Sequence, residues 1–225
     1  MEYPIKVDYE YTDNVYKADK WLKGLPDLIA MDFETASIFT KKRKEILKLK
    51  LDSFSSLTFE QQRLLNQQIL SNGLSHPSLT TITHLSVAWS DRNSFVIVCS
   101  NKRIRNTVLN FIINTDRTQL WHNCIFDFKH VFYNTKQLPK NYIDTQLLAK
   151  CILNDANSAK DSVRLKELMA YAYGDWAVSK DDFTIEEMWN PDMIRYAATD
   201  SCATYKLYED KIRIVTGKQI GRAHV

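Results

Sequence analysis

Residues 28–34 of the chain read Leu-Ile-Ala-Met-Asp-Phe-Glu, and this stretch decides the fold class. The apolar run from Leu28 to Met31 follows two turn-forming residues, so it predicts a buried central strand that ends at Asp32. Alternation along a strand places Asp32 and Glu34 on one face and Phe33 on the other. Two carboxylates therefore converge at one edge of the predicted sheet, where they repel each other unless a cation lies between them. A solvated strand end followed by a turn is the alternative interpretation of this motif taken alone.

The rest of the chain supplies a hairpin and a series of helices. Alternating apolar residues at 81–89 and a β-branched run at 95–99, joined by a turn, predict a hairpin that pairs with the strand at 28–31. Apolar spacing and capping residues predict one more strand at 119–122 and helices at 104–113, 126–133, 145–153, 165–172 and 191–215. Asp144 is the predicted cap of the helix at 145–153. Strands followed by helices that alternate with a further strand indicate an α/β fold, a mixed sheet flanked by helices.

Two segments depart from this plan. Residues from about 40 to 80 begin with a basic stretch and contain a capping-box pattern, so they predict a helical insertion after the first strand. The last six residues, 220–225, read IGRAHV and look like one reading frame of a sequencing adapter. We therefore expect one domain over residues 1–219, a non-native tail at 220–225, and a parent protein that continues further.

Composition excludes several classes of protein. The chain has 225 residues, of which 44% are hydrophobic, and this is enough to bury a core and excludes a disordered protein. No apolar run approaches the roughly 20 residues that span a bilayer. The formal net charge of +3 is too small to indicate nucleic acid binding by itself. Four widely spaced cysteines predict reduced thiols, and we expect a cytoplasmic protein without a membrane partner.

Two more polar motifs stand far along the chain. Asn123 and Asp127 lie at the predicted start of a helix, and Tyr196 and Asp200 lie one turn apart on the last helix. Taken separately, the first pair favours a helix cap and the second a surface pair. Taken with the two carboxylates of the first strand, they give four acids from three segments. Such a set suits a site for two cations with oxygen ligands.

At this point the chain resembles a known family. The motifs Asp32-x-Glu34, Asn123-x-x-x-Asp127 and Tyr196-x-x-x-Asp200 are similar, in order and separation, to the three motifs of DEDD (DnaQ-like) 3′ to 5′ exonucleases. Because the third motif begins with a tyrosine, Tyr196, the chain resembles the DEDDy branch of this superfamily. The stretch DFETASI at 32–38 is most like the proofreading domain of phage-type DNA polymerase I (family A) enzymes. The resemblance implies a ribonuclease H-like fold and no missing active-site carboxylate.

The resemblance also implies a mechanism and a set of site residues. Asp32, Glu34 and Asp200 would hold one Mg²⁺, and Asp32 would bridge to a second Mg²⁺ completed by Asp127, with Mn²⁺ as a substitute. Tyr196 would orient the attacking water, because a phenol with an ordinary pKa near 10 is a poor base at working pH. Further expected substrate contacts are Thr35, Ile38, which in the family wedges against the terminal bases, and Asn123, for which simple capping is equally expected.

The expected activity is removal of nucleoside 5′-monophosphates from single-stranded or frayed DNA 3′ ends. By this resemblance the chain is the proofreading part of a truncated DNA polymerase, with a polymerase domain C-terminal to it in the parent protein. A ribonuclease D-like or helicase-associated nuclease that acts on RNA or structured DNA has the same carboxylates and stays open as an alternative. So does an inactive scaffold domain that binds nucleic acid without cleaving it.

Overall fold

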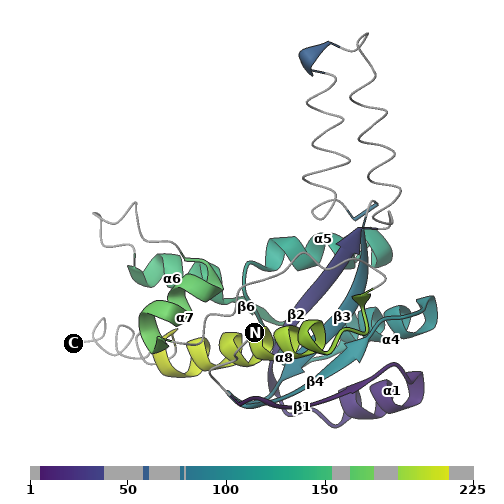
Figure 1. The fold of residues 1–225 in the computed structure, drawn as a ribbon, viewed down its shortest axis with the longest axis horizontal. Helices are drawn as coiled ribbons and strands as arrows, with labels where there is room; N and C mark the ends of the chain where they lie inside the picture. The colour runs from purple at the N-terminus through teal and green to yellow at the C-terminus, as the bar shows by residue number, and fades with distance from the viewer. Residues whose placement is uncertain are drawn as a thin grey trace.

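The computed structural model describes residues 6–37, 58–60, 77–78, 80–153, 163–174 and 187–212. Its elements, in chain order, are β1 (Asp8–Thr12), α1 (Val15–Lys23), β2 (Leu28–Ser37), β3 (Thr80–Ala88), β4 (Asn93–Val98), α4 (Lys102–Asn114), β5 (Thr118–Trp121), α5 (Cys124–Thr135), β6 (Tyr142–Asp144), α6 (Thr145–Leu153), α7 (Leu165–Tyr173), α8 (Pro191–Leu207) and the π-helical turn η4 (Tyr208–Ile212). Figure 1 shows their arrangement.

The strands form one six-stranded mixed sheet in the order β1-β4-β3-β2-β5-β6. β3 is antiparallel to both of its neighbours, whereas the pairs β1–β4, β2–β5 and β5–β6 are parallel. The predicted hairpin is thus confirmed: β3 pairs with β2, and β4 pairs with β3. β2 lies between β3 and β5, so it is a central strand of the sheet.

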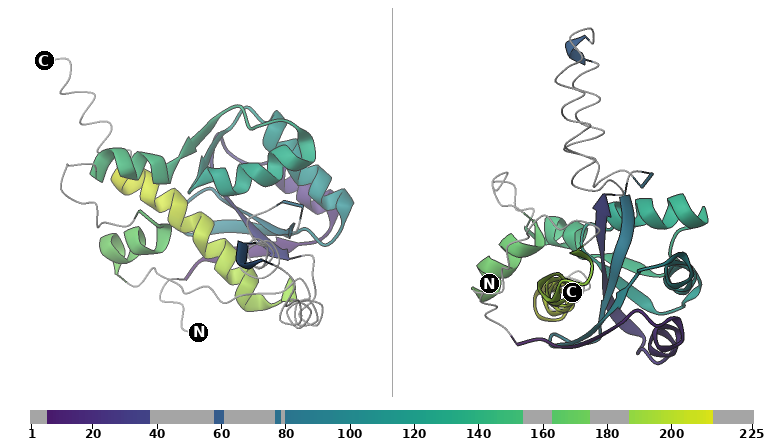
Figure 2. Two further views of the ribbon diagram at one scale, coloured as in Figure 1. Left: turned by 90° about the horizontal axis from the view of Figure 1, so that it is seen from above. Right: turned by 45° about the vertical axis from the view of Figure 1, so that its right-hand side comes forward.

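Helices cover the two faces of the sheet in separate groups. α1, α4 and α5 pack on one face, where the core includes Phe33 and Trp121. α6, α7 and α8 pack on the opposite face, where the core includes Ala30 and Ala198. In the right-hand view of Figure 2, α8 is seen end-on against one side of the sheet, and the helices of the first group lie on the other side. The predicted mixed sheet flanked by helices is confirmed.

The structure extends the predicted strand and adds elements. β2 does not end at Asp32 but continues to Ser37, because the hydrogen bonds with β3 persist past the two acids. β1 and α1 precede it, and α1 begins at the cap Asn14, whose side chain accepts hydrogen bonds from two backbone amides. β6 is a further short strand that the sequence did not predict.

Several predictions fall outside the described residues. Within the expected helical insertion at 40–80, the structure describes 58–60, 77–78 and the first residue of β3, and residues 59 and 60 are helical. The tail at 220–225 also lies outside the described residues. In the described part of the chain, none of the helices has the length and apolar composition that crossing a bilayer requires.

Candidate active site

The strand that carries the first two acids is irregular at the second of them. Glu34 of β2 lies opposite His84 of β3, but Thr35 lies opposite Ile82, so Thr83 is an extra residue on β3. The Thr83 hydroxyl donates to the backbone carbonyl of Glu34 at 3.0 Å. Bulges of this kind re-aim a side chain relative to a regular strand. The bulge therefore fixes the backbone from which the Glu34 carboxylate projects.

Three carboxylates meet between β2 and α8. One side-chain oxygen from each of Asp32, Glu34 and Asp200 lies within 4.8 Å of the others. Glu34 is buried, whereas Asp32 and Asp200 are half-buried. The predicted alternation explains the first two, because Phe33 points into the core on the other face of the sheet, where it packs edge-on against Trp121. α8 brings the third acid because it lies directly over β2 and β3.

Asp127 lies beside this group rather than within it. Its carboxylate is buried in the first turn of α5 and accepts a hydrogen bond from the backbone N–H of Phe33 at 3.3 Å. It therefore contacts β2 at the residue between the other two acids. Burial raises the pKa of Asp127 well above its ordinary value, and the negative charges of Glu34 and Asp144 add to the effect. A nearby cation would reverse this.

Tyr196 stands one helical turn before Asp200 and is buried. Burial raises its pKa far above the usual value, and the charges of Asp200, Glu34 and Asp32 raise it further. The phenol therefore keeps its proton at any working pH and can serve as a hydrogen-bond donor or as an orienting group. It cannot act as a general base in its ionised form.

The β5–α5 turn places Asn123 at the entrance to α5. Asn123 is exposed and adopts the left-handed conformation, with φ 64° and ψ 52°, and its side chain makes no cap hydrogen bond. The capping alternative for Asn123 is therefore wrong. The acceptor comes from Asp144 instead, whose Oδ1 receives the Asn123 N–H at 3.1 Å and whose Oδ2 receives the Cys124 N–H at 3.1 Å. Asp144 was predicted as a cap of α6. This prediction is confirmed, because Asp144 Oδ1 also accepts hydrogen bonds from the N–H groups of Gln146 and Leu147.

Of the two other predicted substrate contacts, the structure describes Thr35. Thr35 follows the bulge and is buried. Ile38 lies outside the described residues.

Sequence reasoning missed two residues that contact site elements. His84 ties β3 to the turn before α8 through Nε2, 2.7 Å from the Met188 carbonyl. Lys166 of α7 places its ammonium over the ring of Tyr196.

The partly buried imidazole of His122 should make the stability of the protein depend on pH. Its Nε2 lies 3.0 Å from the Val163 carbonyl, which can only accept, so the neutral ring carries its proton there. Burial lowers the pKa of His122 from 6.5 to about 4. Because the folded-state pKa is depressed, the stability that this residue contributes is present above pH 6.5 and is lost as the pH falls toward 4.

We expect the loss to be roughly 3 kcal/mol between these two pH values. The His122→Gln variant keeps a donor near Nε2 but does not titrate, so its free energy of unfolding should fall less over the same range. Urea unfolding at a series of pH values measures both curves. Parallel curves for the variant and the wild type would contradict the assignment.

Several solved structures are similar to this chain in fold. Brucella melitensis NrnC bound to pGG matches with a TM-score of 0.58 at 15% identity, over 97% of this chain and 82% of that one. Trypanosoma brucei RNase D in complex with RNA U12 matches with a TM-score of 0.58 at 15% identity, over 92% and 65%. Escherichia coli RNase D, described as an exoribonuclease involved in structured RNA processing, matches with a TM-score of 0.58 at 12% identity, over 94% and 46%. The ribonuclease H-like fold is thereby confirmed.

The sequence itself places the chain in a family. The model of the 3′–5′ exonuclease family matches residues 85–213, more than half of the chain, and this protein belongs to that family of DnaQ-like (DEDD) nucleases. The matched segment includes Asp127, Tyr196 and Asp200 and begins after the two acids of β2. No curated protein sequence matches the chain.

Proposed function

We propose that the protein is a metal-dependent exonuclease that releases nucleoside 5′-monophosphates from the 3′ end of a single strand. The observation that carries this proposal is the meeting of Asp32, Glu34 and Asp200 within 4.8 Å, in a chain of the 3′–5′ exonuclease family. Two of these acids come from β2 and one from α8. Carboxylates so close together repel one another, and a cation bound between them would remove this repulsion.

The donor set fits Mg²⁺, with Mn²⁺ as a substitute. All the candidate ligands are carboxylate oxygens, which hard divalent cations prefer. Asp32, Glu34 and Asp200 would hold one ion, and Asp32 with Asp127 would hold a second. Two bound ions would supply Lewis-acid stabilisation of the charge on the attacking and leaving oxygens. Asp127 fits the second position because its carboxylate is buried and contacts β2 at Phe33, between Asp32 and Glu34.

The other residues of the site would bind and orient. Tyr196 would orient the attacking water through its neutral phenol. The exposed Asn123, held in its left-handed conformation at the start of α5, would contact the substrate backbone near Asp127. Thr35 and Ile38 would contact the terminal nucleotides. An end of a single strand suits such a site, because its unpaired bases are exposed for apolar contacts.

Removal of the phenol oxygen should slow the reaction moderately. We expect Tyr196→Phe to lower kcat roughly 10- to 100-fold, less than the loss of any carboxylate, because a water-orienting hydrogen bond contributes less than a ligand. Because the phenol is not ionised, the variant should keep the pH–rate profile of the wild type. Single-turnover rates across pH 6 to 9 measure both effects. An unchanged rate would remove the orienting role.

The substrate is DNA or RNA, and two observations favour different answers. The DFETASI stretch resembles proofreading domains, which supports DNA 3′ ends. The similar fold of Trypanosoma brucei RNase D in complex with RNA U12 and of Escherichia coli RNase D, an exoribonuclease, supports an RNA substrate at least as well. Both substrates would use the same four acids.

Incubation with Mg²⁺ and matched DNA and RNA strands of one sequence, labelled at the 5′ end, tests both the exonuclease activity and the choice between DNA and RNA. Stepwise shortening from the 3′ end that stops with EDTA supports the exonuclease. Faster shortening of DNA supports proofreading, and faster shortening of RNA supports the RNase D-like reading. A strand that stays intact while it is bound would favour the inactive scaffold instead.

A polymerase domain after residue 219 is a separate proposal that rests on the resemblance of DFETASI alone. The uninterrupted gene tests it directly. Polymerase motifs downstream of the exonuclease would support proofreading, whereas a short gene without them would remove that role and leave the nuclease proposal standing.

A further inference from the structure

Lys166 brings a positive charge to Tyr196. It is the second residue of α7, an element that carries none of the site's carboxylates, and it is partly buried. Its Nζ lies 4.0 Å from the centroid of the Tyr196 ring, well inside the roughly 6 Å within which an ammonium is attracted to an aromatic face. Lys166, which belongs to none of the three motifs, therefore contacts the ring of Tyr196, the tyrosine of the proposed site.

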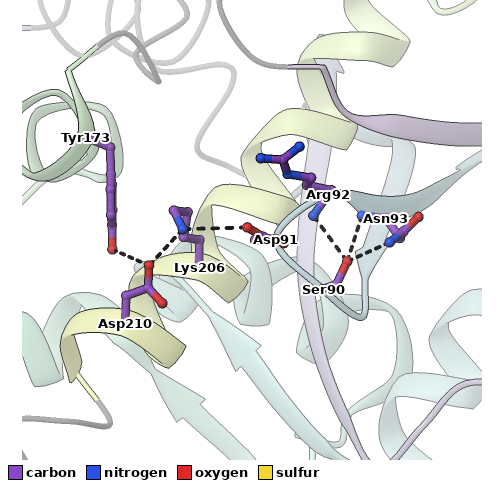
Figure 3. Close-up of polar contacts among 7 residues, drawn as sticks. All are labelled: Ser90, Asp91, Arg92, Asn93, Tyr173, Lys206 and Asp210. Atoms are coloured by element: carbon purple, nitrogen blue, oxygen red, sulfur yellow. Dashed lines mark hydrogen bonds and ion pairs between the residues drawn. The ribbon is translucent and has the colours of Figure 1, made fainter.

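α7 is held against α8 at its other end as well. Figure 3 shows Tyr173, the last residue of α7, with its hydroxyl directed at Asp210 of η4. Tyr173 donates to Asp210 Oδ2 at 3.3 Å, and Lys206 of α8 contacts the same oxygen at 2.8 Å. Lys206 also reaches Asp91 in the β3–β4 turn at 3.6 Å. The C-terminal end of α7 is therefore fixed by polar contacts, seven residues after Lys166.

The spacing along α7 makes this arrangement possible. Lys166, Met169 and Tyr173 lie at i, i+3 and i+7, which share one helix face. Met169 is almost fully buried in the core that includes Ala198 of α8. An apolar anchor therefore lies between two polar contacts, and the face of α7 that packs toward α8 ends at the ring of Tyr196.

We propose that Lys166 is a positioning residue that holds the Tyr196 ring in place and polarises its phenol toward the attacking water. The physical basis is the attraction of the ammonium for the negative face of the ring, which is stronger where water is partly excluded. The ammonium also withdraws electron density from the ring, and this makes the O–H a better hydrogen-bond donor. The inference rests on the proposed exonuclease function, because it acts through Tyr196.

A double-mutant cycle tests the proposal on the full-length chain with Mg²⁺ and a single-stranded oligonucleotide. We expect Lys166→Met to lower kcat roughly 5- to 30-fold with little change in KM. Lys166→Arg keeps a cation over the ring and should restore most of the loss. Tyr196→Phe keeps the ring but lacks the phenol oxygen, so adding Lys166→Met to it should cause little further loss.

Glu167→Gln is the matched control, since it removes an exposed charge from the next residue of α7 and should leave the rate unchanged. Tyr173→Phe removes the hydrogen bond to Asp210, so its kcat measures the effect of loosening α7 while Lys166 is kept. If Lys166→Met does not fold, the cycle is run with Lys166→Gln. Additive losses, a rise in KM, or failure of arginine to rescue would each overturn the positioning role. A wild-type protein that releases no mononucleotide would overturn both the exonuclease proposal and the positioning role of Lys166. An active enzyme whose rate does not depend on Lys166 would overturn the positioning role alone.

Discussion

Replacement of Asp200 by alanine should reduce the release of mononucleotides at least about 10³-fold. The carboxylate of Asp200 is one of three whose oxygens lie within 4.8 Å, and it is the one that α8 contributes. Its loss would leave a bound divalent ion with only the two ligands from β2, Asp32 and Glu34. Metal ions supply several kcal/mol of transition-state stabilisation, and each 1.36 kcal/mol is worth tenfold in rate. Measurement of single-turnover release at saturating Mg²⁺ tests the prediction.

The same substitution should not unfold the protein. Removing one negative charge from a crowded group relieves repulsion, which offsets the loss of the hydrogen bond between Asp200 and the Tyr196 phenol, so the Tm of Asp200→Ala without divalent ions should be close to that of the wild type. Added Mg²⁺ should raise the Tm of the wild type more than that of the variant, because ligand binding to the folded state stabilises it. Asp192→Asn, in the exposed first turn of the same helix, is the control and should keep full activity. An unfolded Asp200→Ala protein would mean that Asp200 has a structural role and not a ligand role.

The central part of the site was accessible from the sequence because it depends on local periodicity. The two acids of β2 follow from alternation, and the pairing of Tyr196 with Asp200 follows from helical spacing. Asp127 was proposed because the Asn123-x-x-x-Asp127 motif resembles the second of the three exonuclease motifs, whereas its place at a helix start favoured only a role in the helix terminus. Its contact with the backbone of Phe33 joins residues 94 positions apart, and no local pattern reports such a contact.

Other features depend on tertiary structure and gave no local signal. β1 is a five-residue edge strand with mostly exposed side chains, so it lacks the buried alternation by which strands are recognised. β6 has only three residues. The contact of Lys166 with Tyr196 depends on the packing of α7 along α8. A lysine in an amphipathic helix is ordinarily a solvated residue, and only the path of the backbone shows otherwise.

Asn123 and Asp144 show how a correct prediction can be incomplete. The sequence around each residue allowed a helix cap, and the structure assigns the capping to Asp144 alone. Its carboxylate also accepts two N–H groups at the start of α5, across a separation of about twenty residues. One side chain thus closes the N-termini of two helices, and the second of these contacts could not be read from sequence because it depends on β5 and β6 lying side by side.

Substitution of Asp144 by alanine should therefore cost more stability than the loss of an ordinary cap. Four backbone N–H groups would lose their acceptor, two at the start of α5 and two at the start of α6. A single cap is worth roughly 1 kcal/mol, and donors left without a partner add a desolvation cost, so we expect a loss of about 2–4 kcal/mol. For a chain of this length, that corresponds to a fall in Tm of roughly 5–15 °C. Urea unfolding and thermal scans measure both quantities.

Two variants separate the double role from simple capping. Asn190 caps α8 alone by accepting the N–H of Asp192 at 2.9 Å, so Asn190→Ala should cost only about 1 kcal/mol. Asp144→Asn keeps an acceptor in place of Oδ1 but sets an amide NH₂ against the Cys124 N–H, so its loss should be intermediate and should fall on α5. Because α5 carries Asp127, hydrogen exchange in Asp144→Asn should increase at the first turn of α5 while α6 stays protected. Equal losses for Asp144→Ala and Asn190→Ala would show that the contacts with α5 contribute nothing to the folded state.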